Sequence, residues 1–377
     1  MDRALQSLKA LLDKREADHT IRALALKGHL IDFASNDYLG YARNRKLNDW
    51  VNQEVANHLD LPEGATGSRL ISGNHTLYEA LEREIAAFHD APAGLIFNSG
   101  YDANIGLFSS VPQKDDLILF DELVHASIRD GIKLSRASSL SFRHHDLGDL
   151  YAKLQGNYRH IFIATESIFS MDGDLAPLQE MVAICKKTGA HLVVDEAHAT
   201  GVFGANGEGL VQQLGLQEYC FARVHTFGKA LGAHGAIVLG NELLKQFLIN
   251  YARSFIYTTA LPLHSLLRIK GAYAQLGNRM EEVDQLRNNC KLFKDLIGVV
   301  PSNNLIANEG PIFSLLIPGN QQAKNISAQL ESAGIYCKAI LYPTVARGQE
   351  RIRVCMHSFN TKSEIELLAS TINQFLS

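Results

Sequence analysis

The stretch His191-Leu-Val-Val-Asp195-Glu-Ala-His198 decides the fold, because it joins an apolar run directly to an acidic and an imidazole side chain. A short apolar run without polar alternation is typical of a strand that is covered on both faces of a parallel sheet. Six further strand candidates occur in the same half of the chain: Gly94–Phe97, Leu117–Phe120, Ser139–Phe142, His160–Ala164, Arg223–Thr226 and Ala236–Leu239. Helical patterns at Thr76–Phe88 and Pro177–Lys187 alternate with them. The pattern predicts an α/β fold with a mostly parallel seven-stranded sheet and helices on both faces.

The pattern changes after about residue 240. A long helical region follows Pro262 as far as about Asp295, and a final helix opens with a capping box of Thr361 and Glu364, like that of Thr76 and Glu79. Three strand candidates lie between these helices: Ile312–Ile317, Ile335–Ile340 and Arg351–Cys355. This part of the chain is therefore expected to be a smaller α+β domain.

The N-terminal segment carries Leu5, Leu8 and Leu12 at helical spacing, which predicts an amphipathic helix that docks on the C-terminal domain or on a partner subunit. We predict three regions from these patterns. They are an N-terminal helix and segment at 1–45, a large domain at 46–240, and a long linking helix with a small C-terminal domain at 241–377.

Composition excludes several classes of protein. The 377 residues carry 36 Lys and Arg against 40 Asp and Glu, a balance that argues against a general nucleic-acid binder. The hydrophobic share of 46% and the charged share of 20% exclude disorder as the main state. No apolar run is long enough to span a membrane, and the N-terminus lacks the apolar core of a signal peptide. Five scattered Cys argue against a disulfide framework and a clustered zinc site, and indicate a reducing cytoplasm; no metal-binding residue is predicted.

Chemical groups follow several of the predicted strands. Ligands of an open parallel sheet bind beyond the carboxyl ends of its strands. Asp195 and His198 follow one strand, Lys229 follows another, His125 follows a third, and Asn98-Ser-Gly-Tyr101 begins a helix whose free N–H groups bind anions. Each has an ordinary structural explanation when taken alone: a helix cap or salt bridge for the Asp, solvent for the Lys, and a packing role for the His. Together, an anion cradle, an acid, two imidazoles and an amine at one sheet edge suit pyridoxal phosphate.

Seven motifs extend this interpretation over nearly the whole chain: Asn36-Asp-Tyr-Leu-Gly40, Thr66-Gly-Ser-Arg-Leu-Ile-Ser-Gly73, His125-Ala-Ser127, Phe169-Ser-Met-Asp-Gly-Asp174, Asp195-Glu-Ala-His-Ala-Thr-Gly201, Thr226-Phe-Gly-Lys229 and Pro343-Thr-Val345. With these motifs in this order, the sequence resembles the α-oxoamine synthase family of fold-type I pyridoxal-phosphate enzymes. The resemblance implies an acyltransferase that joins an amino acid to an acyl thioester with loss of carbon dioxide.

The resemblance also implies a role for each matching residue at the cofactor. Lys229 would be the Schiff-base lysine and the base, Asp195 would pair with the pyridinium nitrogen, and His125 would stack on the ring. His198 and Ser170 would hydrogen-bond the ring oxygen. The phosphate would be held by Ser99, Gly100, Tyr101 and Thr226, and by Thr258 and Thr259 reaching from a neighbouring subunit, so a homodimer is implied.

Substrate-binding positions follow in the same way. Arg353 resembles the family residue that grips the amino-acid carboxylate, and Asn36 is similar to the residue beside it. Arg22 and Thr344 resemble substrate-contacting positions. Alternation along the strand puts Arg351 on the same face as Arg353, so the pattern by itself does not choose between them.

Two features narrow the choice among the reactions of the family. The compact length and the form of residues 67–73 look most like the enzyme of biotin synthesis that uses L-alanine and a pimeloyl thioester. Condensation of glycine with acetyl-CoA is the alternative, and serine with palmitoyl-CoA is another. Tyr342 stands where biotin-pathway relatives usually have Pro, which puts the acyl chain in doubt, whereas Glu196 in place of the commoner Asp is regarded as neutral. The acyl donor is expected to be carried by coenzyme A or by a carrier protein.

Three other functions are alternatives to this one. Aminotransfer on the same fold would use the same Lys and Asp but would return the amino group to an oxo acid. A cofactor-binding regulatory domain should carry a nucleic-acid-binding module, and none is visible. A nicotinamide-dependent enzyme is excluded because no G-x-G-x-x-G follows the first strand candidate.

Overall fold

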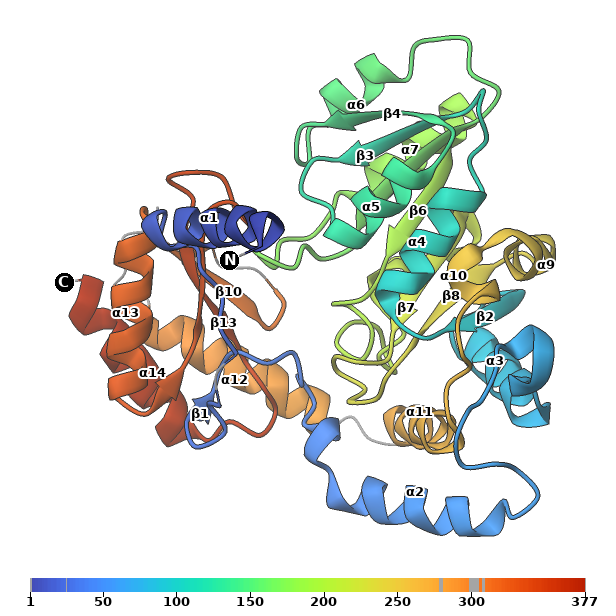
Figure 1. Ribbon diagram of the computed structural model, residues 1–377. Coiled ribbons are helices and arrows are strands. Elements are labelled where there is room, and N and C mark those ends of the chain that lie inside the picture. The colour runs from blue at the N-terminus through green and yellow to red at the C-terminus, as the bar shows by residue number, and fades with distance from the viewer. Residues whose placement is uncertain (1, 25, 278–280, 298–304, 307–308, 377) are drawn as a thin grey trace. The chain divides into compact units, whose positions relative to one another are not determined.

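The computed structural model describes residues 2–24, 26–277, 281–297, 305–306 and 309–376 (Figure 1). The chain divides into two compact units. The larger unit consists of Asp37–Ser170 and Leu175–Val283. The smaller unit consists of Met1–Asn36, Met171–Asp174 and Asp284–Ser377, so it collects three separate stretches of the chain.

A seven-stranded sheet forms the centre of the larger unit in the described part of the chain, in the order β2-β8-β7-β6-β5-β3-β4 (Figure 1). The strands are β2 (Ala93–Phe97), β3 (Leu117–Asp121), β4 (Ser138–Phe142), β5 (Ile161–Glu166), β6 (His191–Asp195), β7 (Cys220–Thr226) and β8 (Ala236–Gly240). Only β8 runs against its neighbours β2 and β7 within this sheet of described residues. The predicted mostly parallel, seven-stranded sheet is therefore confirmed.

Burial explains the positions of the strands in this sheet. Leu192, Val193 and Val194 of the central strand β6 are all buried, as the uninterrupted apolar run predicts. β4, at the edge, exposes residues 138–141 and buries only Phe142. An edge strand with small polar side chains can face water without exposing a large apolar surface.

Helices connect the strands and surround the sheet: α2 (Arg45–Asn57), α3 (Thr76–Phe88), α4 (Gly100–Ser110), α5 (Ala126–Leu134), α6 (Leu147–Lys153), α7 (Leu178–Thr188), α8 (Leu210–Gln213), α9 (Glu242–Tyr251), α10 (Arg253–Ile256) and α11 (Leu263–Leu276). The predicted capping box at Thr76 is wrong, because His75 is the N-cap residue of α3. Glu79 instead accepts a hydrogen bond from the Asn74 amide at 3.2 Å.

The smaller unit contains a four-stranded antiparallel sheet of described residues in the order β12-β13-β10-β9. Its strands are β9 (Leu305–Ile306), β10 (Ile312–Leu316), β12 (Lys338–Ile340) and β13 (Arg351–Cys355). A separate pair joins β1 (Ile31–Asp32) to β11 (Ile335–Tyr336) in parallel. The single strand predicted at Ile335–Ile340 is thus two strands, which part at the buried Cys337 and enter different sheets.

The described helices of this unit are α1 (Arg3–Ala17), α12 (Glu281–Ile297, which enters the unit at Asp284), α13 (Asn320–Ser332) and α14 (Lys362–Leu376). The capping box predicted for the last helix is confirmed. The Thr361 N–H donates to Glu364 Oε2 at 2.7 Å, and the Glu364 N–H donates to Thr361 Oγ1 at 3.3 Å. These two bonds satisfy N–H groups that the first turn of a helix leaves open.

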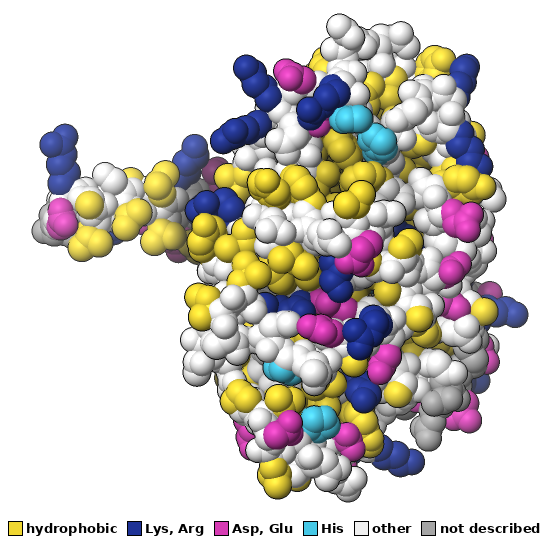
Figure 2. Space-filling view, turned by 90° about the vertical axis from the view of Figure 1, so that its right-hand side faces the viewer, with side chains coloured by type: hydrophobic (Ala, Val, Ile, Leu, Met, Phe, Trp, Pro, Cys, Tyr) yellow, Lys and Arg dark blue, Asp and Glu magenta, His cyan; other side chains and the backbone are white. Residues whose placement is uncertain are grey.

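The surface carries charges of both signs. On the face seen in Figure 2, basic and acidic side chains are interspersed over most of the area, in keeping with the net charge of −4. Among the described helices, none is both long enough and apolar enough to cross a membrane.

Candidate active site

The strands β3, β5, β6 and β7 bring their last residues to one edge of the large sheet, because parallel strands share the position of their carboxyl ends (Figure 1). These residues are Asp121, Glu166, Asp195 and Thr226. Glu166 and Asp195 are direct neighbours in the register of β5 and β6. Acidic and hydroxyl side chains therefore gather where the sequence predicted a ligand.

Asp195 is only 6% exposed, and both of its carboxylate oxygens are hydrogen-bonded. Oδ2 accepts from Asn104 Nδ2 at 2.7 Å, and Oδ1 accepts from the Ala197 N–H at 2.9 Å. Oδ1 therefore stabilises the turn that follows β6, and Oδ2 is held by a side chain of α4. A carboxylate fixed in this way is suited to hold a cationic ring nitrogen.

Asn104 is a site residue that the sequence did not reveal. It lies in α4, where it donates from Nδ2 both to Asp195 and to Ser127 Oγ, the latter at 3.0 Å. Its only signal is a polar amide within a helix of small and apolar residues, which is too weak to identify it from sequence. It links the acid after β6 to the His125-Ala-Ser127 motif.

His125 is the N-cap residue of α5, and its imidazole faces Ser127. The Ser127 N–H donates to Nδ1 at 3.2 Å, and Ser127 Oγ lies 2.8 Å from the same nitrogen. Burial, the largest cause, and the positive charge of Lys229 hold the pKa of His125 below its usual value, against the opposing effect of Asp195. The ring is consequently neutral near pH 7.

Glu166 is a second residue that the motifs did not single out. Its Oε1 accepts from the His125 N–H at 2.6 Å, so it fixes the start of α5. Burial, and then the neighbouring Asp195, raise the pKa of Glu166 to about 8. Glu166 therefore keeps its proton at neutral pH beside Asp195.

Lys229 lies in the turn that follows β7. Its positive charge lowers the pKa of His125. It also opposes the rise in the pKa of Glu166 that burial and Asp195 cause, so the three groups share one electrostatic environment. This neighbourhood joins the amine to the acid and the imidazole that the sequence predicted beside it.

The start of α4 forms a tight cradle against the end of β7. Ser99 is the N-cap residue, and its Oγ accepts from the Asp102 N–H at 3.0 Å. A Cβ at Gly100 would stand 2.5 Å from the Thr226 side-chain methyl, so only Gly permits this approach. Thr226 Oγ1 is buried and has no hydrogen-bond partner in the described part of the chain. A hydroxyl left in this state beside free helix N–H groups fits an anionic phosphate.

Tyr101 and the Thr258–Thr259 pair flank this cradle. The Tyr101 side chain is 47% exposed, and its hydroxyl donates to Asp130 Oδ2 at 2.7 Å. Asn98 Nδ2 donates to Thr258 Oγ1 at 2.9 Å and to the Thr259 carbonyl at 2.7 Å. The pair is therefore tied to the residue that precedes the cradle within its own chain.

Tyr38 is a further buried neighbour of a predicted site residue. Its hydroxyl lies 2.8 Å from His198 Nδ1, and both side chains are buried. Tyr38 stands inside the Asn36-Asp-Tyr-Leu-Gly40 motif, so the signal was present in the sequence without a stated role. This contact fixes the orientation of the His198 ring.

In the smaller unit, the structure separates the two arginines of β13. Arg351 Nη1 is ion-paired with Asp172 Oδ1, whereas Arg353 Nη2 donates to Asn36 Oδ1 at 2.9 Å. Asn36 and Arg353 thus lie together, as the family resemblance implies. Arg351 is committed to a carboxylate of the protein itself.

Arg22 and Thr344 line one cavity of about 700 Å³ in the smaller unit. Its walls are largely apolar, with Ile21, Leu24 and Ile340 among them. Basic side chains line it as well, namely Arg15, Arg22, Lys27, Lys324 and Lys338, and Lys27 is paired with Glu331 at 2.5 Å. Such a cavity suits a ligand that has an apolar chain and anionic groups.

Comparisons with known proteins agree with this geometry. Residues 28–372 match the family model described as aminotransferase class I and II. An 8-amino-7-oxononanoate synthase of Emericella nidulans is 42% identical over 98% of this chain and 95% of its own length. Among solved structures, 8-amino-7-oxononanoate synthase from Francisella tularensis has a TM-score of 0.78 at 29% identity, over 92% of this chain and 99% of that one. Serine palmitoyltransferase from Sphingomonas wittichii has a TM-score of 0.90 at 25% identity, over 99% of this chain and 98% of that one.

These matches extend over nearly the full chain, so they apply to both units together. They confirm the predicted fold-type I architecture, and they identify the chain as an enzyme of the acyltransferase kind. The chain belongs to the aminotransferase class I and II family, and within it to the α-oxoamine synthases that its motifs predict.

Proposed function

We propose that this enzyme uses pyridoxal phosphate to condense L-alanine with a pimeloyl thioester, giving 8-amino-7-oxononanoate, coenzyme A and carbon dioxide in biotin synthesis. The observation that carries the proposal is the convergence of Asp195, His125 and the Gly100–Thr226 cradle at one sheet edge. The choice of substrates rests on the relatives named 8-amino-7-oxononanoate synthase, such as that of Emericella nidulans.

The residues at this edge fit the groups of the cofactor. Thr226, Ser99 and the first N–H groups of α4 would hold the phosphate, and Asp195 would hold the ring nitrogen in its cationic form. His198 and Ser170 would contact the ring oxygen. When bound, the cofactor supplies an electron sink that makes the α-proton of an amino acid acidic.

The protein's own groups then manage protons and orientation. Lys229 Nζ, as a neutral amine, would take the α-proton of the amino acid, and its effect on His125 and Glu166 supports its place beside them. The neutral His125 imidazole would stack on the ring, and its proton would be available to the acyl oxygen. Asn104 keeps Asp195 in place through a 2.7 Å hydrogen bond.

Two places in the smaller unit would receive the substrates. Arg353, steadied by Asn36, would bind the amino-acid carboxylate, because a guanidinium matches a carboxylate with two parallel hydrogen bonds. The cavity of Arg22 and Thr344 would receive the acyl donor, with its basic side chains near the anionic groups of the thioester carrier.

A homodimer is part of the proposal. Four leucines of α1, at positions 5, 8, 11 and 12, are 53–63% exposed, and none of the helix's residues is buried. A stripe of this kind is stabilised when another surface covers it. In a symmetric dimer, Thr258 and Thr259 of each subunit would contact the phosphate that is held in the cradle of the other subunit.

Glycine with acetyl-CoA remains the alternative, and one observation bears on it. Tyr342 lines the cavity together with Thr344, and the Arg347 guanidinium lies 4.7 Å from the centre of its ring. A Tyr at this position changes the size and polarity of the space for the acyl chain, so it acts on the acyl donor and leaves the cofactor chemistry untouched.

A thiol-release assay tests the function. Alanine, glycine and serine are each combined with acetyl, succinyl, pimeloyl and palmitoyl thioesters, and released thiol is measured. The highest kcat/KM is expected for alanine with the pimeloyl donor. A clear preference for glycine with acetyl-CoA would replace the proposal by the alternative, and amino exchange with an oxo acid without thiol release would indicate an aminotransferase.

A further inference from the structure

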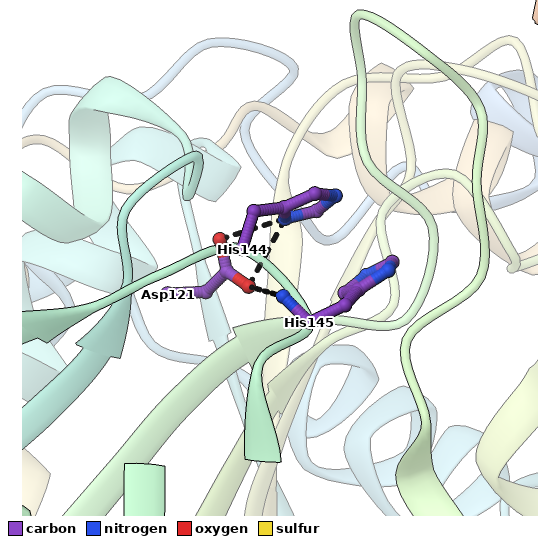
Figure 3. Close-up of side chains that lie close together, drawn as sticks. All are labelled: Asp121, His144 and His145. Atoms are coloured by element: carbon purple, nitrogen blue, oxygen red, sulfur yellow. Dashed lines mark hydrogen bonds and ion pairs between the residues drawn. The ribbon is translucent and has the colours of Figure 1, made fainter. Parts of the chain in front are cut away.

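Asp121, His144 and His145 bring three metal-ligand side chains together beside the carboxyl ends of β3 and β4 (Figure 3). Asp121 ends β3, and the two histidines lie in the loop between β4 and α6. One possible ligand atom from each residue lies within 4.8 Å of the other two. The proposed condensation uses none of these three residues. The sequence predicts no metal ligands, and its scattered cysteines argue against a clustered zinc site.

The Asp121 carboxylate is held in a fixed orientation. The residue is 1% exposed, Oδ1 accepts from the Leu123 N–H at 2.8 Å, and Oδ2 accepts from the His145 N–H at 3.1 Å. His144 Nδ1 lies 2.9 and 3.1 Å from the two oxygens, so these groups share a proton. The backbone donors orient the carboxylate in the way that outer hydrogen bonds orient a metal ligand.

The two imidazoles are held side by side. Their ring centroids are 3.7 Å apart with an angle of 29° between the planes, and both rings extend from the loop in the same direction (Figure 3). The backbone of His145 has φ = 57°, a left-handed conformation that few residues other than Gly, Asn, Asp and His adopt. Phe169 packs edge-on against both rings, with centroid distances of 4.5 and 5.2 Å.

We propose that Asp121, His144 and His145 form a binding site for a divalent transition-metal ion such as Zn²⁺ or Co²⁺. The ion would replace the proton that His144 shares with Asp121. Two imidazoles and one carboxylate are a common ligand set for such ions, and they leave a fourth position for water. Two nitrogens on one tetrahedral Zn²⁺ lie about 3.3 Å apart, so binding would require the stacked rings, with ligand atoms now within 4.8 Å, to rotate toward one ion.

The same contacts also fasten the loops after β3 and β4 to each other when no ion is bound. A purely structural cluster and a metal site differ in one measurable respect, which is affinity for the ion. Phe169, which contacts both rings, precedes Ser170, a residue expected at the cofactor ring.

Isothermal titration of the full-length holoenzyme with ZnCl₂ tests the proposal, and the visible absorption of added Co²⁺ reports the geometry. One equivalent is expected to bind in the micromolar range or tighter. His145→Asn removes an imidazole while Asn tolerates the left-handed backbone, and it should weaken binding by about tenfold or more. Asp121→Asn should do the same if the variant folds, but the decision does not depend on it.

A matched control is available at the other end of the large sheet. His160 and His191 also lie close together, with 3.4 Å between their ring nitrogens, but they belong to no group of three metal-ligand side chains among the described residues. The His160→Asn/His191→Asn variant should bind Zn²⁺ like the unaltered protein. Binding only at millimolar concentrations, equal affinity in His145→Asn, or loss of binding in the control variant would each overturn the proposal.

Discussion

At the scale of single residues, the edge of the large sheet combines groups that are charged with groups that stay neutral. Asp195 is fixed by Asn104, while Glu166 beside it holds a proton at neutral pH because its pKa is about 8. Two adjacent buried carboxylates would repel each other, so only one of them carries a charge. A single negative charge is thus available for a cationic ring.

The first prediction concerns Lys229. Lys229→Ala should abolish the visible absorption of covalently bound cofactor and lower turnover by at least about a thousandfold, because it removes both the attachment and the base. Absorption spectra and thiol release on the same preparation measure the two effects. Borohydride reduction followed by peptide mapping is the control, and a tag on a different lysine in the variant would show that the assignment is wrong.

The pH dependence of stability should depend on Glu166. Its pKa is about 4.5 in the unfolded chain and about 8 in the fold, so the folded state retains a proton that the unfolded state loses between these values. The free energy of unfolding should therefore fall as pH rises through this window, by about 1.4 kcal/mol for each unit of pKa difference. Glu166→Gln keeps an acceptor for the His125 N–H and should flatten the dependence.

Urea unfolding at pH 6 and pH 9, with the unaltered protein and Glu166→Gln compared, checks this expectation. The unaltered protein should lose more stability between the two values than the variant. Equal losses in both proteins would mean that Glu166 does not hold the proton.

The two arginines of β13 should behave differently. Arg353→Lys should weaken binding of L-alanine by about tenfold or more, since Lys lacks the paired donors of a guanidinium and such contacts contribute on the order of 1.5–3 kcal/mol. Arg351→Lys disturbs the pair with Asp172 and should lower the melting temperature while leaving alanine affinity unchanged. Spectral titration of the holoenzyme with L-alanine measures both, and a reversed result would assign the carboxylate to Arg351.

At the scale of elements, the contact between the start of α4 and the end of β7 shapes the phosphate cradle. Gly100→Ala would place a Cβ 2.5 Å from the Thr226 methyl, so the helix must move away from the strand. Overpacking of this kind costs about 1–3 kcal/mol, and we expect cofactor affinity to fall by roughly tenfold or more. Fluorescence titration of the apoprotein with pyridoxal phosphate measures the change.

Two variants accompany this experiment. Gly64→Ala adds a Cβ where no atom lies within 4 Å and should leave affinity unchanged. Thr226→Ser removes the methyl but keeps the hydroxyl, so combining it with Gly100→Ala should restore most of the lost affinity. A double variant as weak as Gly100→Ala would indicate that the contact is not the cause.

At the scale of the whole molecule, the exposed leucines of α1 predict association. Leu8→Glu combined with Leu12→Glu should convert a dimer to monomers, because charges on a covered apolar stripe are costly to bury. Lys14→Glu changes a residue on the opposite side of the same helix from Leu5 and serves as the control. Analytical ultracentrifugation distinguishes the outcomes, and a dimer that survives the double substitution would place the interface elsewhere.

The sequence by itself determined the layered α/β architecture and the family. Buried parallel strands read as apolar runs, so β6 and its neighbours were visible without coordinates, and the motif residues after them had to meet at one edge. Asp195, His125 and the anion site at the start of the helix at Gly100 were predicted for this reason, and Thr226 was added by the family resemblance. The roles of the individual residues stay predictions until the variants are measured.

Only the tertiary structure decided what depends on contacts between distant parts of the chain. Local pattern does not record that Asn104 reaches Asp195, that Glu166 accepts the His125 N–H, or that Arg351 is paired with Asp172. A side chain's partner and its pKa are set by neighbours that fold in from other elements, and a period of two along a strand gives only the face on which it lies. For the same reason, the meeting of Asp121 with His144 and His145 became visible only in the fold.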